Sequence, residues 1–277
     1  MNQVTIITGA ANGIGRKLAT DLIAHGNQTL ILCDIDTDKL RAEFADQKVD
    51  CQQLDVTKAA SWQTLIDSVV AQHGRLDLLC NIAGIIEPDW VDQASIDSID
   101  RHVDINVKGV LYGTKLAAEQ MVRQGNGHII NMASLAGIAI TPGISFYGAS
   151  KHAVRGFSLT LASELRPKGI AVTCICPGVV ETGMLDAQID RPEGAIAFAG
   201  GKPLTTKQVS LAIQKAMVSR PVEVCLPSSF FAKLVNTFPR LGARLYGRFD
   251  KLGSDAAAKL RRSGKYRSGA ERSDLFG

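Results

Sequence analysis

The sequence predicts an α/β fold, a doubly wound parallel sheet of about seven strands with helices on both faces. Two observations support this prediction. Short apolar runs alternate with longer amphipathic stretches along most of the chain, which is the order of elements in a βαβ protein. Several of these runs, such as residues 170–176, are almost entirely apolar, as expected of strands that are covered on both faces.

The elements follow one another in a regular order. Strands are expected at residues 4–8, 29–34, 51–55, 76–81, 128–132, 170–176 and 222–226. Amphipathic helices are expected at residues 13–24, 59–73, 95–124 and 147–166. Residues 182–206 are rich in Gly, Ala and Pro and lack a clear period. We interpret this segment as a lid over a ligand crevice or as a short helical excursion.

Composition is that of an ordinary globular protein, with 45% hydrophobic and 21% charged residues in 277. No apolar run reaches the roughly 18 residues of a membrane span. No basic leader with an apolar segment precedes the first expected strand, so we expect a cytoplasmic protein. The six cysteines form no CxxC pair, and most lie in apolar runs. We interpret them as buried thiols and expect neither a metal site nor disulfides.

One domain is expected over residues 1–226, followed by a basic amphipathic extension at 227–277. The extension holds eleven Lys and Arg against four Asp and Glu, a net charge of +7, whereas the rest of the chain carries −3. Apolar residues at helical spacing are Phe230, Phe231, Leu234, Val235, Phe238, Leu241, Leu245 and Phe249, and a basic stripe contains Arg240, Arg244 and Arg248. Pro239 predicts a break, and the end beyond about Ser263 is expected to be disordered.

Three interpretations of this extension remain open. It packs over the ligand crevice or a partner subunit, it makes a peripheral contact with an anionic membrane surface, or it is a loosely ordered tail. No nucleic-acid recognition module accompanies the basic charge, so we expect no nucleic-acid partner.

The first strand-to-helix turn reads Thr8-Gly-Ala-Ala-Asn-Gly-Ile-Gly15. Its glycines allow a tight turn and close approach of backbone N–H groups to phosphate at a helix N-terminus. In a Rossmann-type sheet this turn binds the pyrophosphate of a dinucleotide. Asp34 ends the second strand, nineteen residues after Gly15, where a carboxylate accepts hydrogen bonds from ribose hydroxyls and repels a 2′-phosphate. NAD is therefore expected, and NADP is disfavoured, although Arg16, Lys39 and Arg41 lie nearby in the sequence.

Chemistry is suggested by polar residues that follow later strands. Tyr147 and Lys151 stand at i and i+4, on one face of a helix. A neighbouring ammonium favours phenolate and would bring the tyrosine pKa toward the working range. Ser134 follows the 128–132 strand and can donate a hydrogen bond to a carbonyl or alkoxide oxygen. Asn106 lies mid-helix, where its amide could hold a water or be no more than a helix defect.

Together these motifs resemble the short-chain dehydrogenase/reductase family. The successive matches are Thr8–Gly15, Asn81-Ile-Ala-Gly84, Asn106, Ser134, Tyr147-Gly-Ala-Ser-Lys151 and Pro177-Gly-Val-Val-Glu-Thr182, and they cover roughly residues 4–226. They stand in family order, which is far more specific than any one motif. The domain at 1–226 would then be catalytic and dinucleotide-binding.

The resemblance implies a role for each matching residue. Tyr147 would be the general acid and base, Lys151 would lower its pKa and bind ribose, Ser134 would hold the substrate oxygen, and Asn106 would support a proton-relay water. The implied cofactor contacts are Gly9, Asn12, Gly13, Ile14, Gly15, Asp34, Asp55, Val56, Asn81, Ala83, Gly84, Tyr147, Lys151, Pro177, Gly178, Val180 and Thr182.

The expected activity is hydride transfer between NAD(H) and a small-molecule secondary alcohol or ketone. The pocket residues expected from the sequence are Ile138, Ile144, Val179 and Met184, which suggest a fairly apolar substrate. Departures from the family are Ile82, where many relatives have Asn, and the ending at residues 220–227, which lacks a common Gly-Gly pair. We expect a homodimer or homotetramer. Two alternatives stay open: an NADPH-preferring carbonyl reductase, and a non-catalytic nucleotide-binding or membrane-associated scaffold.

Overall fold

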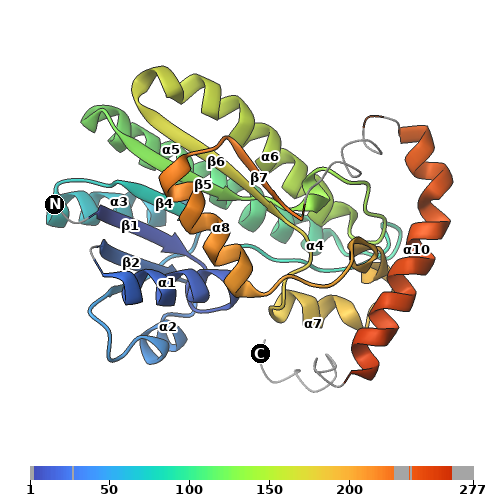
Figure 1. Cartoon of the computed structure of the whole chain (residues 1–277). Helices are drawn as coiled ribbons and strands as arrows, with labels where there is room; N and C mark the ends of the chain where they lie inside the picture. Colours follow the sequence, from blue (N-terminus) through green and yellow to red (C-terminus); the bar gives the residue numbers. More distant parts are fainter. Residues whose placement is uncertain (1–2, 27, 228–236, 238, 264–277) are drawn as a thin grey trace.

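The protein is built around one parallel sheet of seven strands, in the order β3-β2-β1-β4-β5-β6-β7 (Figure 1). The computed structural model describes residues 3–26, 28–227, 237 and 239–263. The strands are β1 (Gln3–Thr8), β2 (Gln28–Asp34), β3 (Asp50–Gln53), β4 (Leu78–Asn81), β5 (Gly127–Met132), β6 (Ile170–Pro177) and β7 (Glu223–Leu226). All seven expected strands are confirmed, with ends that differ by at most two residues. The order reverses between β1 and β4, which opens a ligand crevice beyond their carboxyl ends.

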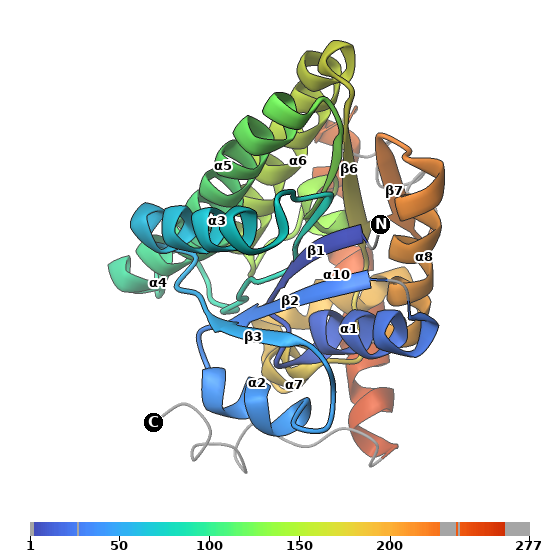
Figure 2. The ribbon, with the colours of Figure 1, turned by 90° about the vertical axis from the view of Figure 1, so that its left-hand side faces the viewer.

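Helices cover both faces of the sheet, as predicted (Figure 2). They are α1 (Gly13–His25), α2 (Thr37–Glu43), α3 (Ala59–His73), α4 (Ile96–Arg101), α5 (Gly109–Gln124), α6 (Ser145–Leu165), α7 (Gly183–Ile189), α8 (Thr206–Ser219) and α10 (Pro239–Arg262). One core cluster joins α1 and α8 to the sheet through residues such as Leu18 and Ile213. A second cluster joins α3, α5 and α6 to the opposite face through residues such as Trp62 and Met121.

The helix expected at residues 95–124 is interrupted. Between α4 and α5, residues His102–Lys108 form a π-helix, η1, in which each hydrogen bond spans five residues instead of four. The extra residue per turn changes the direction of the side chains that follow, and such turns often occur at functional sites. Asn106 lies in this stretch and is completely buried.

The segment at residues 182–206 is helical, in agreement with one of its two interpretations. It contains α7 and a 3₁₀ segment, η4 (Pro192–Gly200). A β-carbon on Gly143, in the loop before α6, would lie 2.7 Å from the carbonyl carbon of Glu193, so this loop and η4 are in direct contact. Arg191 donates a hydrogen bond to the Pro88 carbonyl, 3.4 Å away. The segment is therefore tied both to the loop before α6 and to the loop after β4.

The C-terminal helix α10 begins at Pro239, where the sequence predicts a break, and packs across η4 (Figure 1). Ala257 is buried against Leu185, Ile189 and Phe198. Nε of Arg261 lies 3.7 Å from Oδ1 of Asp190, within ion-pair distance. The extension thus packs on the segment that borders the expected substrate pocket, while its basic stripe, Arg240, Arg244 and Arg248, is exposed.

Phe230, Phe231, Leu234, Val235, Phe238 and residues 264–277 fall outside the described part of the chain. Among the described residues, no helix is both long and apolar enough to cross a membrane. Contact with a membrane surface stays a prediction.

Gly253 allows α10 to dock, and its replacement tests the contact. A β-carbon there would overlap the Ala195 carbonyl and lie 2.8 Å from its carbon atom, so Gly253→Ala should destabilise the docked helix by about 1–3 kcal/mol. Gly247→Ala, on the same helix with no neighbour within 4 Å, should be neutral or stabilising by up to about 1 kcal/mol. Thermal unfolding and hydrogen exchange of α10 measure both. Equal behaviour of the two variants would contradict the docked arrangement.

Candidate active site

Three loops meet at the carboxyl ends of the strands, and glycines set their separation. Gly9 has φ +67°, and a β-carbon there would lie 3.0 Å from the Ala83 backbone nitrogen. A β-carbon on Gly13 would lie 3.1 Å from Cγ2 of Thr182. The glycine loop therefore touches both the loop after β4 and the loop after β6. These are three of the motifs on which the resemblance rests.

The glycine loop has the geometry that a dinucleotide pyrophosphate requires. Asn12 precedes α1 in extended backbone and is exposed, and the first turn of the helix contains no acidic side chain. The N–H groups of that turn and the helix dipole thus favour an anion. Ile14 is half-buried and packs against the core cluster below the loop. The residues present fit a nicotinamide dinucleotide.

Asp34 closes the glycine loop as well as flanking it. The Ala11 N–H donates to its Oδ2 at 2.9 Å, and the Asp36 N–H donates to Oδ1 at 3.3 Å. Beyond Asp34 lies a cavity of about 350 Å³ lined by Ile35, Asp36, Thr37, Asp38, Arg41 and Gln53. Arg16, the nearest cation to the loop in sequence, pairs with Glu43 at 3.1 Å. The carboxylates of Asp34, Asp36 and Asp38 and the guanidinium of Arg41 therefore border the place where an adenosine ribose would bind.

Asp55 and Val56 shape the loop after β3. Oδ1 of Asp55 accepts hydrogen bonds from the Thr57 N–H at 2.9 Å and the Thr57 hydroxyl at 2.6 Å. Val56 fills the space beside Gly109, where a β-carbon would approach its Cγ2 to 2.9 Å. Their contact with an adenine stays a prediction.

The Asn81 side chain is hydrogen-bonded within the fold. Its Nδ2 donates to Thr114 Oγ1 at 3.0 Å and to Asn131 Oδ1 at 2.9 Å, inside the interface between the sheet and α5. Thr8, which the sequence analysis did not select as a site residue, holds the loop beyond Asn81: its Oγ1 accepts the N–H groups of Ile82 at 3.0 Å and Ala83 at 3.1 Å. The sequence could not indicate this role of Thr8, because the pairing of β1 with β4 brings the two segments together.

Ser134, Tyr147 and Lys151 converge at the ends of β5 and β6. The Ser134 hydroxyl donates to the Pro177 carbonyl at 3.3 Å and accepts the Ala136 N–H at 3.1 Å. Nζ of Lys151 is buried and donates to the Met132 carbonyl at 3.0 Å. The same Nζ lies 5.6 Å from the centre of the Tyr147 ring. The three side chains that the sequence places in separate motifs thus form one group.

Asn106 completes this group from the π-helix. Its Nδ2 donates to the Ile85 carbonyl at 2.9 Å and to Ser150 Oγ at 3.1 Å, and its Oδ1 accepts the Ile85 N–H at 2.8 Å. A β-carbon on Gly84 would lie 3.0 Å from that Oδ1 and 3.4 Å from Nζ of Lys151. Asn106 is therefore not a simple helix defect: it ties the loop after β4 to the helix that carries Tyr147.

A family model described as short chain dehydrogenase matches residues 3–193. The chain belongs to this family. Cyclopentanol dehydrogenase of Comamonas testosteroni is 35% identical over 221 residues, which cover 76% of this chain and 88% of the relative. The 3-alpha-(or 20-beta)-hydroxysteroid dehydrogenase of Mycobacterium tuberculosis is 34% identical over 212 residues, 76% of this chain and 80% of the relative.

Solved structures agree with the family assignment. A short-chain dehydrogenase/reductase of Burkholderia phymatum in complex with NAD superposes with a TM-score of 0.75 at 29% identity, over 83% of this chain and 91% of that one. ElxO with NADP bound superposes with a TM-score of 0.70 at 27% identity, over 78% and 91%. The present short-chain dehydrogenase is thus an oxidoreductase with a fold that binds nicotinamide dinucleotides, and its neighbours include both cofactor types.

Burial dominates the electrostatics of the catalytic group in this short-chain dehydrogenase. Burial raises the pKa of Tyr147, and a hydrogen bond with Ser134 opposes that rise. Burial lowers the pKa of Lys151 to about 8. In this structure the shifts of both groups follow from lost solvation of their charged forms, and a lowering of the tyrosine pKa by Lys151 stays a prediction.

His102 supports Tyr147 and carries no motif by which the sequence could identify it. Its ring meets the Tyr147 ring edge-on, with centroids 6.5 Å apart. Nε2 accepts the Glu87 N–H at 3.3 Å, so Nδ1 carries the proton and donates to the Ser98 carbonyl at 2.7 Å. An imidazole held by two hydrogen bonds thus packs against the Tyr147 ring.

Two of the four expected pocket residues lie together beside Tyr147. Ile144 and Met184 pack with Ile86 and Ala136 in a cluster that includes Tyr147. Ile138 belongs to a separate cluster beneath the sheet end, and Val179 packs toward α7 and α10. The apolar side chains that pack with Tyr147 are therefore Ile144, Met184, Ile86 and Ala136.

Proposed function

We propose that this short-chain dehydrogenase interconverts a fairly apolar secondary alcohol and its ketone with NAD(H). The observation that carries the proposal is the convergence of Ser134, Tyr147 and Lys151 at the carboxyl ends of β5 and β6, beside the glycine loop. The likeness to a cyclopentanol dehydrogenase and a hydroxysteroid dehydrogenase supports a cyclic alcohol as the substrate class.

Each member of the group has a distinct role. The Tyr147 hydroxyl exchanges a proton with the substrate oxygen, and Ser134 donates a hydrogen bond to the same oxygen. Lys151 holds positive charge near the phenol and is fixed by the Met132 carbonyl. A nicotinamide dinucleotide, held by the glycine loop and by Pro177, Gly178, Val180 and Thr182, supplies the hydride chemistry when bound. The protein contributes orientation and electrostatics.

A panel of alcohols and ketones, followed by NADH absorbance, tests the substrate class. It should include cyclic alcohols, steroids, retinoids, linear aliphatic alcohols and sugars. We expect the largest kcat/KM for a cyclic or steroidal secondary alcohol, because Ile144, Met184 and Ile86 offer little to hydrogen-bond a polyol. A sugar as the best substrate would overturn the class.

Asp34 should decide the preference for NADH over NADPH. The carboxylates of Asp34, Asp36 and Asp38 outnumber the guanidinium of Arg41 at the place where a 2′-phosphate would lie, so the NADPH dissociation constant should be at least about tenfold larger than that of NADH, which is about 1.4 kcal/mol. Asp34→Asn keeps an oxygen for the Ala11 N–H and should bring the dissociation constants of NADPH and NADH closer together. Asp34→Ala removes this hydrogen bond, which opens the glycine loop, and should weaken the binding of both cofactors. Fluorescence titration measures both constants. Tighter binding of NADPH to the unaltered protein would reverse the assignment.

The reaction should depend on pH in opposite senses in its two directions. Ketone reduction needs protonated Tyr147 and should lose kcat/KM as pH rises, whereas alcohol oxidation should gain it. Because the lysine pKa is lowered to about 8 and the tyrosine pKa is raised, the first transition, near pH 8, should be the loss of the Lys151 charge, and the tyrosine transition should follow at higher pH. Lys151→Met removes the cation and should abolish the transition near pH 8. An unchanged profile in that variant would contradict this assignment.

A further inference from the structure

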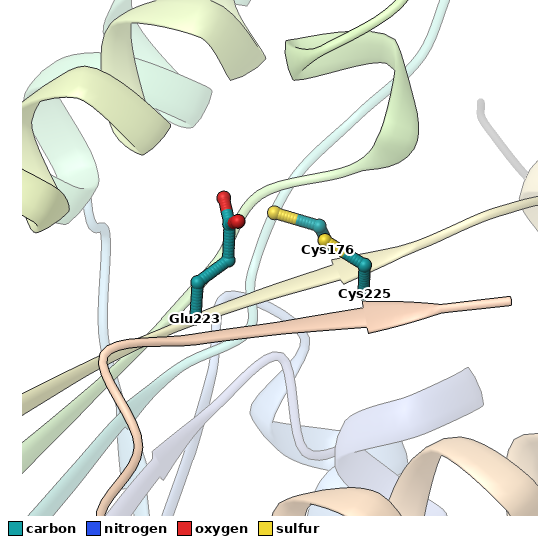
Figure 3. A group of neighbouring side chains, drawn as sticks. All are labelled: Cys176, Glu223 and Cys225. Carbon is teal, nitrogen blue, oxygen red and sulfur yellow. The ribbon is translucent and has the colours of Figure 1, made fainter. Parts of the chain in front are cut away.

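Four chemically reactive side chains share one face of the sheet at its β7 edge. In the register of β6 and β7, Cys174 lies opposite Glu223, and Cys176, two residues further along, lies opposite Cys225. Alternate residues of a strand point to the same face, so all four project together. Figure 3 shows Cys176, Glu223 and Cys225, which we term the β6–β7 cluster, on the same side of the two strands. From the sequence alone these cysteines are expected to be buried thiols with no metal site.

The spacing of the cluster is close to that of a metal centre. One ligand atom of each of Cys176, Glu223 and Cys225 lies within 4.8 Å of the other two. Sγ of Cys174 lies 3.7 Å from Sγ of Cys176. Two sulfurs bound tetrahedrally to one Zn²⁺ at about 2.3 Å stand about 3.8 Å apart. Side-chain rotations that move the ligand atoms by about 1 Å would therefore bring them to the separations of a tetrahedral zinc site.

We propose that the β6–β7 cluster binds one thiophilic divalent cation such as Zn²⁺, with the sulfurs of Cys176 and Cys225 and a carboxylate oxygen of Glu223 as ligands. A water molecule would supply the fourth ligand. Two thiolates and a carboxylate are a donor set that suits Zn²⁺ and discriminates against Mg²⁺ and Ca²⁺, which prefer oxygen alone. This inference does not depend on the reaction proposed above.

The carboxylate is already held in place, and the site can be reached. Arg155, on α6, donates from Nε to Oε1 of Glu223 at 2.6 Å, which fixes the carboxylate beside the sulfurs. Cys176 is buried, but Glu223 and Cys225 are only partly so. Since β7 is the last strand of the sheet, an ion can approach from that edge.

Binding exchanges protons for metal. An ordinary thiol has a pKa of about 8.5 and must lose its proton to bind a metal ion. Coordination of both thiolates releases two protons to solvent, and affinity must therefore rise with pH.

Occupancy would reach the active site through the backbone. Cys176 is followed by Pro177, whose carbonyl accepts the Ser134 hydroxyl. A metal ion that links β6 to β7 would fix the end of β6, from which the expected cofactor loop begins. We therefore expect binding to stabilise the fold first and to alter turnover only secondarily.

The test uses the full chain without an affinity tag, stripped of metal and reduced with a phosphine, and titrated with Co²⁺ and then Zn²⁺. We expect one Co²⁺ per chain with a thiolate-to-cobalt charge-transfer band, bleached by Zn²⁺, and a rise in Tm. Cys225→Ser should lose the band and Glu223→Gln should weaken binding at least about tenfold, equivalent to about 1.4 kcal/mol. Cys51→Ser, a partly buried cysteine outside the cluster, should bind as the unaltered protein does.

Circular dichroism and NADH binding check that each variant is folded. Absence of the band in the folded, unaltered protein would overturn the proposal, and so would an equal band in Cys225→Ser. A thiol count below six in protein purified without reductant and then denatured would indicate a disulfide in place of the metal site.

Discussion

Tyr147→Phe should lower kcat by about 10²- to 10⁴-fold, the range that a positioned general acid or base contributes. The substitution removes the hydroxyl to which we assign the proton exchange with the substrate oxygen. It leaves the ring, so the edge-on contact with His102 is kept. Binding of NADH should change little, because the glycine loop and Asp34 are untouched. Steady-state turnover of the best alcohol from the panel and a fluorescence titration with NADH measure the two effects.

Tyr112→Phe is the matched control, since Tyr112 is a partly buried tyrosine on α5 that packs in a different core cluster. It should retain turnover. If Tyr147→Phe kept kcat within about threefold of the unaltered protein, the assignment of general acid and base would be wrong. Loss of both turnover and NADH binding would indicate a folding defect, which thermal unfolding distinguishes.

The strands, and the convergence of the candidate catalytic residues, were predictable from the sequence for clear physical reasons. Parallel strands buried on both faces leave apolar runs such as residues 170–177, and Ser134 lies two residues beyond the end of another such strand, β5. The i, i+4 spacing of Tyr147 and Lys151 needs only a helix to bring them to one face. The local sequence pattern is therefore enough to predict the fold class and the proximity of Tyr147 and Lys151.

Other features depend on contacts between distant segments. The π-helix at Asn106 leaves no periodic signal, because a single extra residue shifts the pattern only once. Asn81 occupies a family cofactor motif, yet its amide is directed into the network with Thr114 and Asn131. His102 becomes part of the site only through packing against Tyr147.

The same limit applies to the electrostatics of Tyr147 and Lys151. An i, i+4 spacing shows that Lys151 lies near Tyr147, but it does not show how deeply the pair is buried. Burial lowers the lysine pKa and raises the tyrosine pKa. The spacing indicates the partners, and the packed fold determines their charge.

Gly15→Ala should raise the NADH dissociation constant by about 100-fold or more, equivalent to about 2.7 kcal/mol. A β-carbon at this position would overlap the carbonyl of Gly9 and lie 2.7 Å from its carbonyl carbon. The obstacle is backbone, which cannot rotate away as a side chain can. The turn must then open, which separates the N–H groups at the start of α1 from the place where the pyrophosphate binds. NADH titration by fluorescence measures the loss.

Gly156→Ala separates this steric effect from a general effect of glycine replacement. Gly156 lies within α6, and a β-carbon there meets nothing within 4 Å. Alanine should therefore stabilise that helix by about 0.5–1 kcal/mol and leave NADH binding unchanged. Both variants make the same chemical change in a helix, so a difference between them reports the contact with Gly9. If Gly15→Ala bound NADH within about threefold of the unaltered protein, the close approach of the loop to α1 would not be what shapes the cofactor site.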